Sequence, residues 1–383
     1  MLNFNVSHNE FLANYFEQQP LLCAASLSEP IMQWHDLDLL LHSIEPDEQL
    51  IQMFLNGQVP PASFLDETIA FGRCRKIINK HHFYNLLQNG ATLVLNRVEN
   101  FSIAAKRLCM EVGKFAQQPT TGNAYVSFCG TGSFGKHWDT HDVFAIQLVG
   151  KKLWQLYPPT LPLPLSQQTS RKSPRECPAT PTFECILAAG DVLYIPRGWW
   201  HQVTPLDVAS LHLSVGTYPP TVLDYVLWVC NRQLPQLLEA RRSCVDMDSL
   251  KPDLATIMGV AVKEVLDNKN MKEFIYHLHT RERLSSEFQT ALLMGTLDSN
   301  LNEHVQLSLT SVYKIESDNF EIPANGGRLK LTPISYAVVN LLNRTGSLNW
   351  PELCAELLQY PQTAVRNAVL DLARYDILNI QKF

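Results

Sequence analysis

The sequence predicts an α+β fold in which helices surround a β barrel or sandwich. Between residues 124 and 218, short apolar runs with strand character are separated by turn residues, as in antiparallel β architectures. Before residue 116 and between residues 221 and 300, apolar residues instead recur at helical spacing. The last part of the chain combines three helical patterns with a final apolar strand, which is typical of a winged-helix module.

The N-terminal part of the chain is expected to form short helices and one strand before the barrel. A helix at 7–19 would begin at Ser7, whose hydroxyl can cap it. Further helices are expected at 36–42, 46–56, 83–87 and 101–115, and a strand is expected at 91–95. The strands of the barrel are expected at 143–149, 153–157, 183–187, 192–196 and 211–215. Residues 158–182 are rich in Pro, Ser, Thr and Gln, and we expect a long loop that borders the functional site.

The C-terminal part is expected to be helical up to a small closing domain. Leu223, Val226 and Leu227 share one helical face, and Pro235 should end that helix. Further helices are expected at 271–279, 286–293, 335–343, 351–358 and 362–375, followed by a strand at 377–380.

Composition describes an ordinary globular protein of two or three domains. The 383 residues are 46% hydrophobic and 18% charged, with a net charge of −6, which argues against binding nucleic acid through bulk charge. Nine scattered cysteines without a CxxC pair indicate reduced thiols. With neither a signal-peptide pattern nor a membrane-spanning apolar run, we expect a cytoplasmic protein without membrane contact.

The segment His137-Trp138-Asp139 and the distant His201 carry the strongest chemical signal. On an extended backbone the side chains of His137 and Asp139 point to the same side, so both can coordinate one metal ion. His201 can complete the set if the sheet folds back on itself. Two imidazoles and one carboxylate leave adjacent coordination positions open, which is the ligand set of non-heme Fe(II) oxygenases. We therefore predict His137, Asp139 and His201 as the metal ligands and catalytic centre.

His141 is a rival ligand because it shares the parity of His137 and Asp139. We rank it below His201, since three consecutive same-face residues form a line and not one face of an octahedron. A His-x-Asp pair can also arise by chance on a surface strand. The turn residues before His137 and around 196–198 favour the metal site.

Lys152 is the next candidate. Lys152, Trp154 and Leu156 share one face of an expected strand, and that face is otherwise apolar. A lysine inside a barrel must find a partner or lose its proton. A diacid held on the metal by one end could offer its far carboxylate to Lys152. The alternative is an ammonium that reaches the barrel rim.

Residues 123–157 and 190–203 resemble the JmjC-type 2-oxoglutarate oxygenases. Within them the chain is most similar to the ribosomal oxygenases, which hydroxylate an arginine or histidine side chain of ribosomal proteins. Segments 11–22 and 89–102 resemble that branch as well. The resemblance implies a double-stranded β-helix (jelly-roll or cupin) barrel, Fe(II) on the three ligands, and 2-oxoglutarate as co-substrate with Lys152 at its far carboxylate.

The resemblance also implies further co-substrate contacts. Asn123-Ala124-Tyr125 matches an Asn-x-Tyr of the histidine-hydroxylating members, and Ser214 occupies a strand position near the co-substrate. That branch has serine where this chain has Gly216, whereas the arginine branch favours arginine at Lys152 and lacks the Asn-x-Tyr. The target side chain therefore stays open between arginine and histidine.

The same resemblance implies three domains: an oxygenase domain at 1–219, a helical dimerisation domain at 220–305 and a winged-helix-like domain at 306–383. We expect a homodimer through 220–305; the alternative is that these helices only pack on the barrel. Residues 331–383 contain four basic and four acidic residues, so this segment has no net positive charge and nucleic-acid binding is not expected there.

The function expected from these features is an Fe(II)- and 2-oxoglutarate-dependent hydroxylase of a ribosomal protein. The alternatives are an oxygenase that acts on another peptide or a small metabolite, and a non-catalytic cupin that binds a partner.

Overall fold

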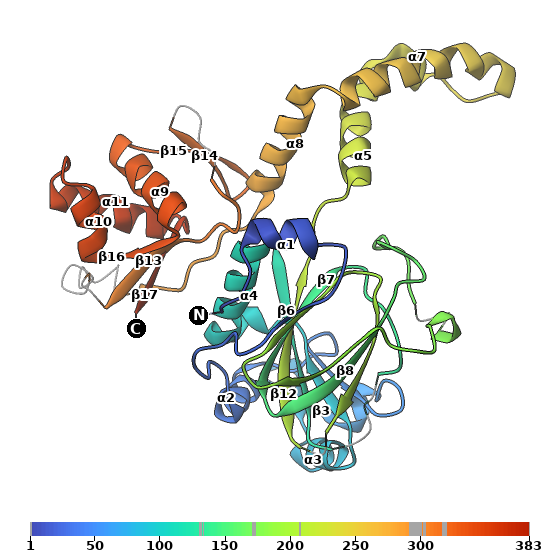
Figure 1. Ribbon diagram of the computed structural model, residues 1–383, viewed down its shortest axis with the longest axis vertical. Helices are drawn as coiled ribbons and strands as arrows, with labels where there is room; N and C mark the ends of the chain where they lie inside the picture. The colour runs from blue at the N-terminus through green and yellow to red at the C-terminus, as the bar shows by residue number, and fades with distance from the viewer. Residues whose placement is uncertain are drawn as a thin grey trace. The chain divides into compact units, whose positions relative to one another are not determined.

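The computed structural model describes residues 2–129, 132, 134–170, 174–206, 208–290, 301, 304–315 and 320–382. It divides into two compact units, Met1–Tyr218 and Pro219–Phe383, which are treated separately below. Figure 1 shows the elements of both units. All nine cysteines are free thiols, as expected. Among the described residues, no helix is both long and apolar enough to cross a membrane.

The first unit is a β structure with helices before and between its early strands. Its helices are α1 (His8–Asn14), α2 (Trp34–Ser43), α3 (Lys80–Gln88) and α4 (Ile103–Ala116). Its early strands are β1 (Leu21–Cys23), β2 (Ile51–Phe54), β3 (Leu65–Ala70), β4 (Arg73–Ile78) and β5 (Thr92–Leu95). The later strands are β6 (Thr120–Ser127), β7 (Asp142–Val149), β8 (Lys151–Tyr157), β9 (Phe183–Ala188), β10 (Val192–Ile195), β11 (Trp200–Pro205) and β12 (Ser210–Thr217).

Two antiparallel sheets form the barrel. The larger has seven strands in the order β1-β10-β7-β12-β6-β5-β2, and the smaller has three in the order β11-β8-β9. A shared apolar core joins them, with Val143 and Ala145 from β7, Leu193 from β10, and Trp154 and Leu156 from β8. Inward and outward residues alternate along β8, since the face with Lys152 is buried and its opposite face is partly exposed. The expected double-stranded β-helix barrel is thereby confirmed.

The other face of the large sheet is covered by α4 and by the N-terminal segment. Helix α4 packs on β6 and β12. Phe11 of α1 is fully buried and lies 5.0 Å from Phe115, 5.8 Å from Phe144 and 4.8 Å from Tyr194, measured between ring centroids. Ser7 caps α1, as expected, because its hydroxyl accepts from the backbone N–H of Glu10.

Three sequence expectations for the first unit need correction or supplement. The expected helix at 46–56 is wrong, because residues 51–54 form strand β2 and pair with β5. Ile51 and Met53 alternate with less buried neighbours, and the ladder to β5 outweighs local helical propensity. Helix α1 is shorter than the expected 7–19. The hairpin of β3 and β4, which turns at Phe71 and Gly72, was not expected at all.

The second unit begins with helices. They are α5 (Val222–Gln233), α6 (Leu238–Arg241), α7 (Met247–Val265) and α8 (Asn268–Arg281). Helix α5 ends at Gln233, just before a 3₁₀ turn over Leu234–Gln236 that contains Pro235, as expected. Of the expected helix at 286–293, residues 286–289 are irregular and residues 291–293 lie outside the described residues.

The rest of the second unit is a small domain with its own apolar core. Its elements are β13 (Val305–Leu309), β14 (Glu321–Ala324), β15 (Gly327–Lys330), α9 (Pro333–Thr345), β16 (Ser347–Asn349), α10 (Trp350–Glu356), α11 (Gln362–Arg374) and β17 (Leu378–Lys382). The three expected helices and the final strand are present. Strands β16, β13 and β17 form one antiparallel sheet.

Replacing Phe11 by alanine should lower the free energy of unfolding of the first unit by about 3–5 kcal/mol, because it leaves a cavity among buried rings. Leu12→Ala is the matched control: Leu12 lies next to Phe11 on the same helix but is 41% exposed, so its loss should cost about 1 kcal/mol or less. Urea unfolding followed by near-ultraviolet circular dichroism measures both. Equal effects of the two substitutions would contradict this packing.

Candidate metal centre

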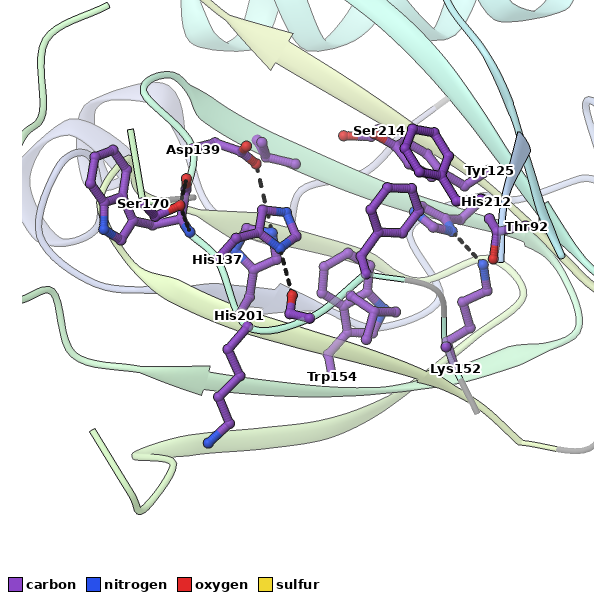
Figure 2. A pocket seen from close by; sticks show the side chains of 18 of the residues that line it. Thr92, Tyr125, His137, Asp139, Lys152, Trp154, Ser170, His201, His212 and Ser214 are labelled. Carbon is purple, nitrogen blue, oxygen red and sulfur yellow. Dashed lines mark hydrogen bonds and ion pairs between the residues drawn. The ribbon is translucent and has the colours of Figure 1, made fainter. Parts of the chain in front are cut away.

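The three predicted ligands meet at one point of the barrel. One ligand atom each from His137, Asp139 and His201 lie within 4.8 Å of one another. The Nε2 atom of His201 is 3.7 Å from Oδ2 of Asp139, and the two imidazole centroids are 4.2 Å apart. Figure 2 shows the three side chains gathered at one end of a cavity. His141 is not part of the group, because its ring stacks on Tyr218 at 4.9 Å.

A single β-bridge brings the two distant segments together. The backbone N–H of His201 donates to the carbonyl of His137 at 2.8 Å, and the reverse bond measures 3.2 Å. His137 therefore belongs to an isolated bridge and not to the regular strand that the sequence suggested. Gly198 also donates to the carbonyl of Asp139 at 3.0 Å. Both ligand-bearing segments are thus held in register at the ligands themselves.

Both histidines present Nε2 to the common point. Nδ1 of His137 lies 2.9 Å from the Gly135 carbonyl, and Nδ1 of His201 lies 3.2 Å from the Trp199 carbonyl. A proton on Nδ1 satisfies these carbonyls and leaves the Nε2 lone pair for a metal. Burial lowers the pKa of His201 to about 4, which keeps it in the neutral form that ligates metal. The donor set and its tautomers fit a divalent ion such as Fe(II).

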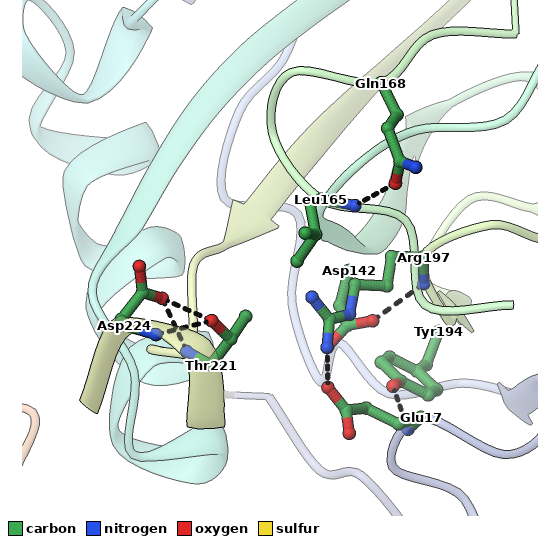
Figure 3. A network of polar contacts seen from close by, with 8 residues as sticks. All are labelled: Glu17, Asp142, Leu165, Gln168, Tyr194, Arg197, Thr221 and Asp224. Carbon is green, nitrogen blue, oxygen red and sulfur yellow. Dashed lines mark hydrogen bonds and ion pairs between the residues drawn. The ribbon is translucent and has the colours of Figure 1, made fainter. Parts of the chain in front are cut away.

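A polar network fixes the turn that precedes His201 (Figure 3). The backbone N–H of Arg197 donates to the buried Asp142 at 2.8 Å, and its guanidinium donates to Glu17 at 2.6 Å. The backbone N–H of Glu17 in turn donates to the hydroxyl of Tyr194 at 3.0 Å. Burial is the main cause that raises the pKa of Asp142 to about 7. The N-terminal segment is thereby tied to the strand and turn that position His201.

The long loop 158–182 braces the other ligand segment. The Ser170 hydroxyl accepts from the backbone N–H of Trp138 at 3.1 Å and donates to its carbonyl at 3.0 Å. Trp138 packs with Trp200 and Tyr157. Gln168, Thr169 and Ser170 line the cavity, so the expectation that this loop borders the site is confirmed.

Lys152 lies in the same cavity, which has a volume of about 750 Å³. Its side chain points between the two sheets and is only 3% exposed. The alternative of an ammonium at the barrel rim is therefore wrong. Nζ lies 3.0 Å from Nδ1 of His212. Burial lowers the pKa of Lys152 to about 7.

The remaining predicted residues divide into two groups. Tyr125 and Ser214 line the cavity together with Lys152. Asn123 is not among the lining residues, since its side-chain oxygen accepts from the backbone N–H of Arg97 at 3.0 Å. Ser214 lies directly across the β6–β12 ladder from Asn123.

Sequence reasoning missed several residues of the cavity. His212 lies in the apolar run 211–215, where a single polar residue attracts no attention, although its parity with Ser214 places both on one face. Gln52 and Phe54 come from strand β2, in the segment 46–56 that was predicted to be helical, and Gln58 comes from the turn after it. Thr92 of β5 also lines the cavity, and its place beside Tyr125 and His212 depends on sheet order.

Residues 96–225 match the family model of the JmjC domain. The bifunctional lysine-specific demethylase and histidyl-hydroxylase NO66 of Dictyostelium discoideum is 34% identical over 190 residues, which cover 49% of this chain and 36% of that protein. Ribosomal oxygenase 2 of Rattus norvegicus is 29% identical over 204 residues, which cover 48% of this chain and 43% of that protein. The matched part of this chain thus spans less than half the length of these relatives. The resemblance stated from the sequence is confirmed.

Solved structures match over the whole chain. The ribosomal oxygenase YcfD of Escherichia coli aligns with a TM-score of 0.58 and 15% identity, covering 100% of this chain and 99% of that one. A structure of YcfD in complex with cobalt and 2-oxoglutarate aligns with a TM-score of 0.59 and 15% identity, with complete coverage of both chains. At this identity the likeness establishes the fold.

His137→Ala should abolish metal retention, because two donors at this point do not hold a divalent ion at the affinity of three. His141→Ala is the control on the same segment and should bind metal as the unmodified protein does. Titration of the metal-free protein with Mn(II), followed by calorimetry, measures both. If His137→Ala bound Mn(II) with unchanged affinity, the three-residue site would be wrong.

Proposed function

We propose, from the JmjC domain that residues 96–225 of this chain carry, that the protein is an Fe(II)- and 2-oxoglutarate-dependent protein hydroxylase whose substrate is a ribosomal protein. The observation that carries the proposal is one cavity with a His-Asp-His set at one end and a buried lysine at the other. The names of the curated relatives and the cobalt and 2-oxoglutarate complex of YcfD support it.

The division of roles follows from the placement of the side chains. His137, Asp139 and His201 would hold the metal, and bound Fe(II) with 2-oxoglutarate supplies the means to activate O2 for C–H hydroxylation. Lys152 would receive the far carboxylate of 2-oxoglutarate, with Tyr125 and Ser214 on the neighbouring wall. The apolar walls at Val143, Trp154 and Val203 exclude water around these groups.

The charges of the cavity favour a neutral target side chain. Among its described lining residues Asp139 is the single carboxylate, and it belongs to the proposed metal site. Lys136 and Lys152 are the lysines there. A substrate guanidinium would therefore meet no spare carboxylate, whereas an imidazole needs only hydrogen-bonding groups such as the amides of Gln52 and Gln58. Of the two target types that the sequence left open, we favour histidine, which agrees with the histidyl-hydroxylase in the name of the NO66 relative.

The buried lysine also weighs against a non-catalytic binding module. Burying an ammonium without a carboxylate partner costs several kcal/mol of folding free energy. A protein that only binds a partner gains nothing that would offset this cost. Hydroxylation of another peptide or of a small metabolite is the alternative, and the mass comparison below distinguishes it from a ribosomal substrate. We retain the cytoplasm as the expected compartment, where ribosomal proteins are made.

We also propose that residues 220–305 mediate a homodimer. Leu254, Met258 and Val262 of α7 are spaced four residues apart and are each about half exposed, so they form an apolar stripe along this helix. A stripe of this kind is suited to burial against the same helices of a second copy. For residues 306–383 we propose a winged-helix-like module in structural or protein contact, because its helices and three-stranded sheet fit that layout and its charges balance.

Intact-mass comparison of ribosomal proteins from cells with and without this gene tests the substrate. We expect one ribosomal protein to lose the mass of one oxygen atom when the gene is deleted, and peptide fragmentation should place the lost oxygen on a histidine. No mass change in any ribosomal protein would favour the other peptide or metabolite as substrate.

Lys152→Met should raise the KM for 2-oxoglutarate by about 10- to 100-fold, because a charged hydrogen bond to the far carboxylate is lost. Lys151→Met is the matched control, since Lys151 is exposed on the opposite face of the same strand. Succinate formation with the identified substrate measures both variants. Equal KM values for the two would remove Lys152 from the co-substrate site.

The dimer is tested by placing charge on the apolar stripe. Leu254→Glu combined with Val262→Glu should produce a monomeric mass by light scattering, with the circular dichroism spectrum preserved. A control at the exposed Lys251 of the same helix, Lys251→Glu, should stay dimeric. A monomeric mass for the unmodified protein would refute the proposal.

A further inference from the structure

The end of the cavity remote from the metal ligands contains a pair of basic side chains that support each other. Nζ of Lys152 and Nδ1 of His212 are 3.0 Å apart, and the two residues are 3% and 5% exposed. Figure 2 shows the pair with Thr92 and Tyr125 around it, separated from the His-Asp-His group by Trp154. His212 lies outside the site residues that the sequence indicated.

The imidazole of His212 is held rigidly. Its ring stacks on Tyr125 with centroids 4.9 Å apart and planes 6° from parallel. The indole of Trp154 meets it edge-on at 5.5 Å and 79°. His212 also sits on the central strand β12, paired with Tyr125 of β6 on one side and Gln147 of β7 on the other. Its Nδ1 atom therefore has a fixed position and direction.

When Lys152 is charged, its ammonium can only donate, so Nδ1 of His212 must be the acceptor and His212 must be neutral. Burial first, and the charge of Lys152 second, hold the pKa of His212 well below its ordinary value. An imidazole thus satisfies one N–H of the lysine without cancelling its charge. A carboxylate at the same place would form a fixed ion pair and repel an incoming carboxylate.

We propose that His212 is a positioning residue that aims Lys152 and makes this end of the cavity selective for a ligand with a far carboxylate. The proposal rests on the proposed use of 2-oxoglutarate and adds a residue and a selection rule to it. One N–H of the ammonium is directed to His212, and the others are left for the carboxylate oxygens of the ligand. The ligand then brings a negative charge to an end of the cavity where the described lining residues include no carboxylate.

Proton uptake follows from the same arrangement. Since burial holds the pKa of Lys152 near 7 before the ligand binds, a carboxylate beside it restores the charged form. Below pH 7 the lysine is already charged, so affinity for the diacid should be constant there. Above pH 7 each molecule bound takes up about one proton, and affinity should fall about tenfold per pH unit.

The other titratable groups that line the cavity are Tyr125 from β6, His212 from β12, His201 from β11, and Lys136, His137, Asp139 and His141 from the segment before β7.

Two substitutions at His212 separate its functions. His212→Phe keeps a flat ring against Tyr125 and Trp154 but removes the acceptor. His212→Asn loses the ring but keeps an acceptor oxygen close to the position of Nδ1. We measure binding of 2-oxoglutarate and of pyruvate by calorimetry, in the absence of oxygen and with Mn(II) in place of iron. Pyruvate shares the metal-binding 2-oxo acid end and lacks the far carboxylate.

The expected result is a loss of about tenfold or more in 2-oxoglutarate affinity for His212→Phe, with pyruvate affinity unchanged. His212→Asn should stay within about threefold of the unmodified protein for both ligands. Unchanged 2-oxoglutarate binding by His212→Phe, or an equal loss in both variants, would overturn the role of His212. If the unmodified protein bound no 2-oxoglutarate, the proposed function itself would fail, which is a different outcome.

Proton counting on the unmodified protein provides a test that does not depend on any variant folding. Calorimetry in two buffers of different ionisation enthalpy should show about one proton more taken up with 2-oxoglutarate than with pyruvate at pH 8, and little difference at pH 6. An equal proton count for the two ligands at pH 8 would show that the protonation of Lys152 does not respond to the far carboxylate. The predicted proton uptake at this end of the cavity would then be wrong.

Discussion

A lysine ammonium enclosed between two β-sheets, with a neutral imidazole as its hydrogen-bond partner, is the constraint on which one end of the cavity depends. Lys152 can sit there only because β8 faces β12 across the barrel and β12 carries His212 at the matching height. Burial of an uncompensated charge costs several kcal/mol. A ligand carboxylate would offset much of that cost. The offset would add to the binding free energy of ligands that carry such a carboxylate, and it would make the cavity selective for them.

The end with the proposed metal ligands depends on a different constraint: two segments that are far apart in sequence must pair with each other. His137 and His201 come from segments far apart in sequence, and a single β-bridge joins them at the ligand residues. Its surroundings are reinforced by Ser170 from the long loop and by the link from Glu17 to Arg197. Each of these contacts acts on backbone or on a turn, so the proposed ligands are positioned through the main chain.

The sequence predicted the parts of the site that depend on local spacing. Two features could be interpreted without the fold: the two-residue spacing of His137 and Asp139, and the apolar residues that share a strand face with Lys152. His212 could not, because a histidine within an apolar strand gains meaning only when the strand order places it opposite a lysine. Strand β2 was missed for a similar reason: its few residues become a strand through the ladder with β5. Asn123 fitted a motif, yet its side-chain oxygen accepts from the backbone N–H of Arg97, which follows the neighbouring strand β5, and Asn123 is not among the lining residues of the cavity.

The two ends of the cavity are built from different kinds of structure, and this separates their roles. Lys152, Trp154, Tyr125 and His212 lie on regular strands that pair on both sides. The end with the proposed metal ligands is bordered by irregular segments, including the stretch around Lys136 and the loop with Gln168. Side chains on paired strands hold their positions more closely than side chains on loops, which tolerate change. A barrel of this design can therefore hold the proposed co-substrate site on fixed strands while its loops adapt to different target side chains. The scarcity of carboxylates among the described lining residues is a property of those loops as much as of the strands.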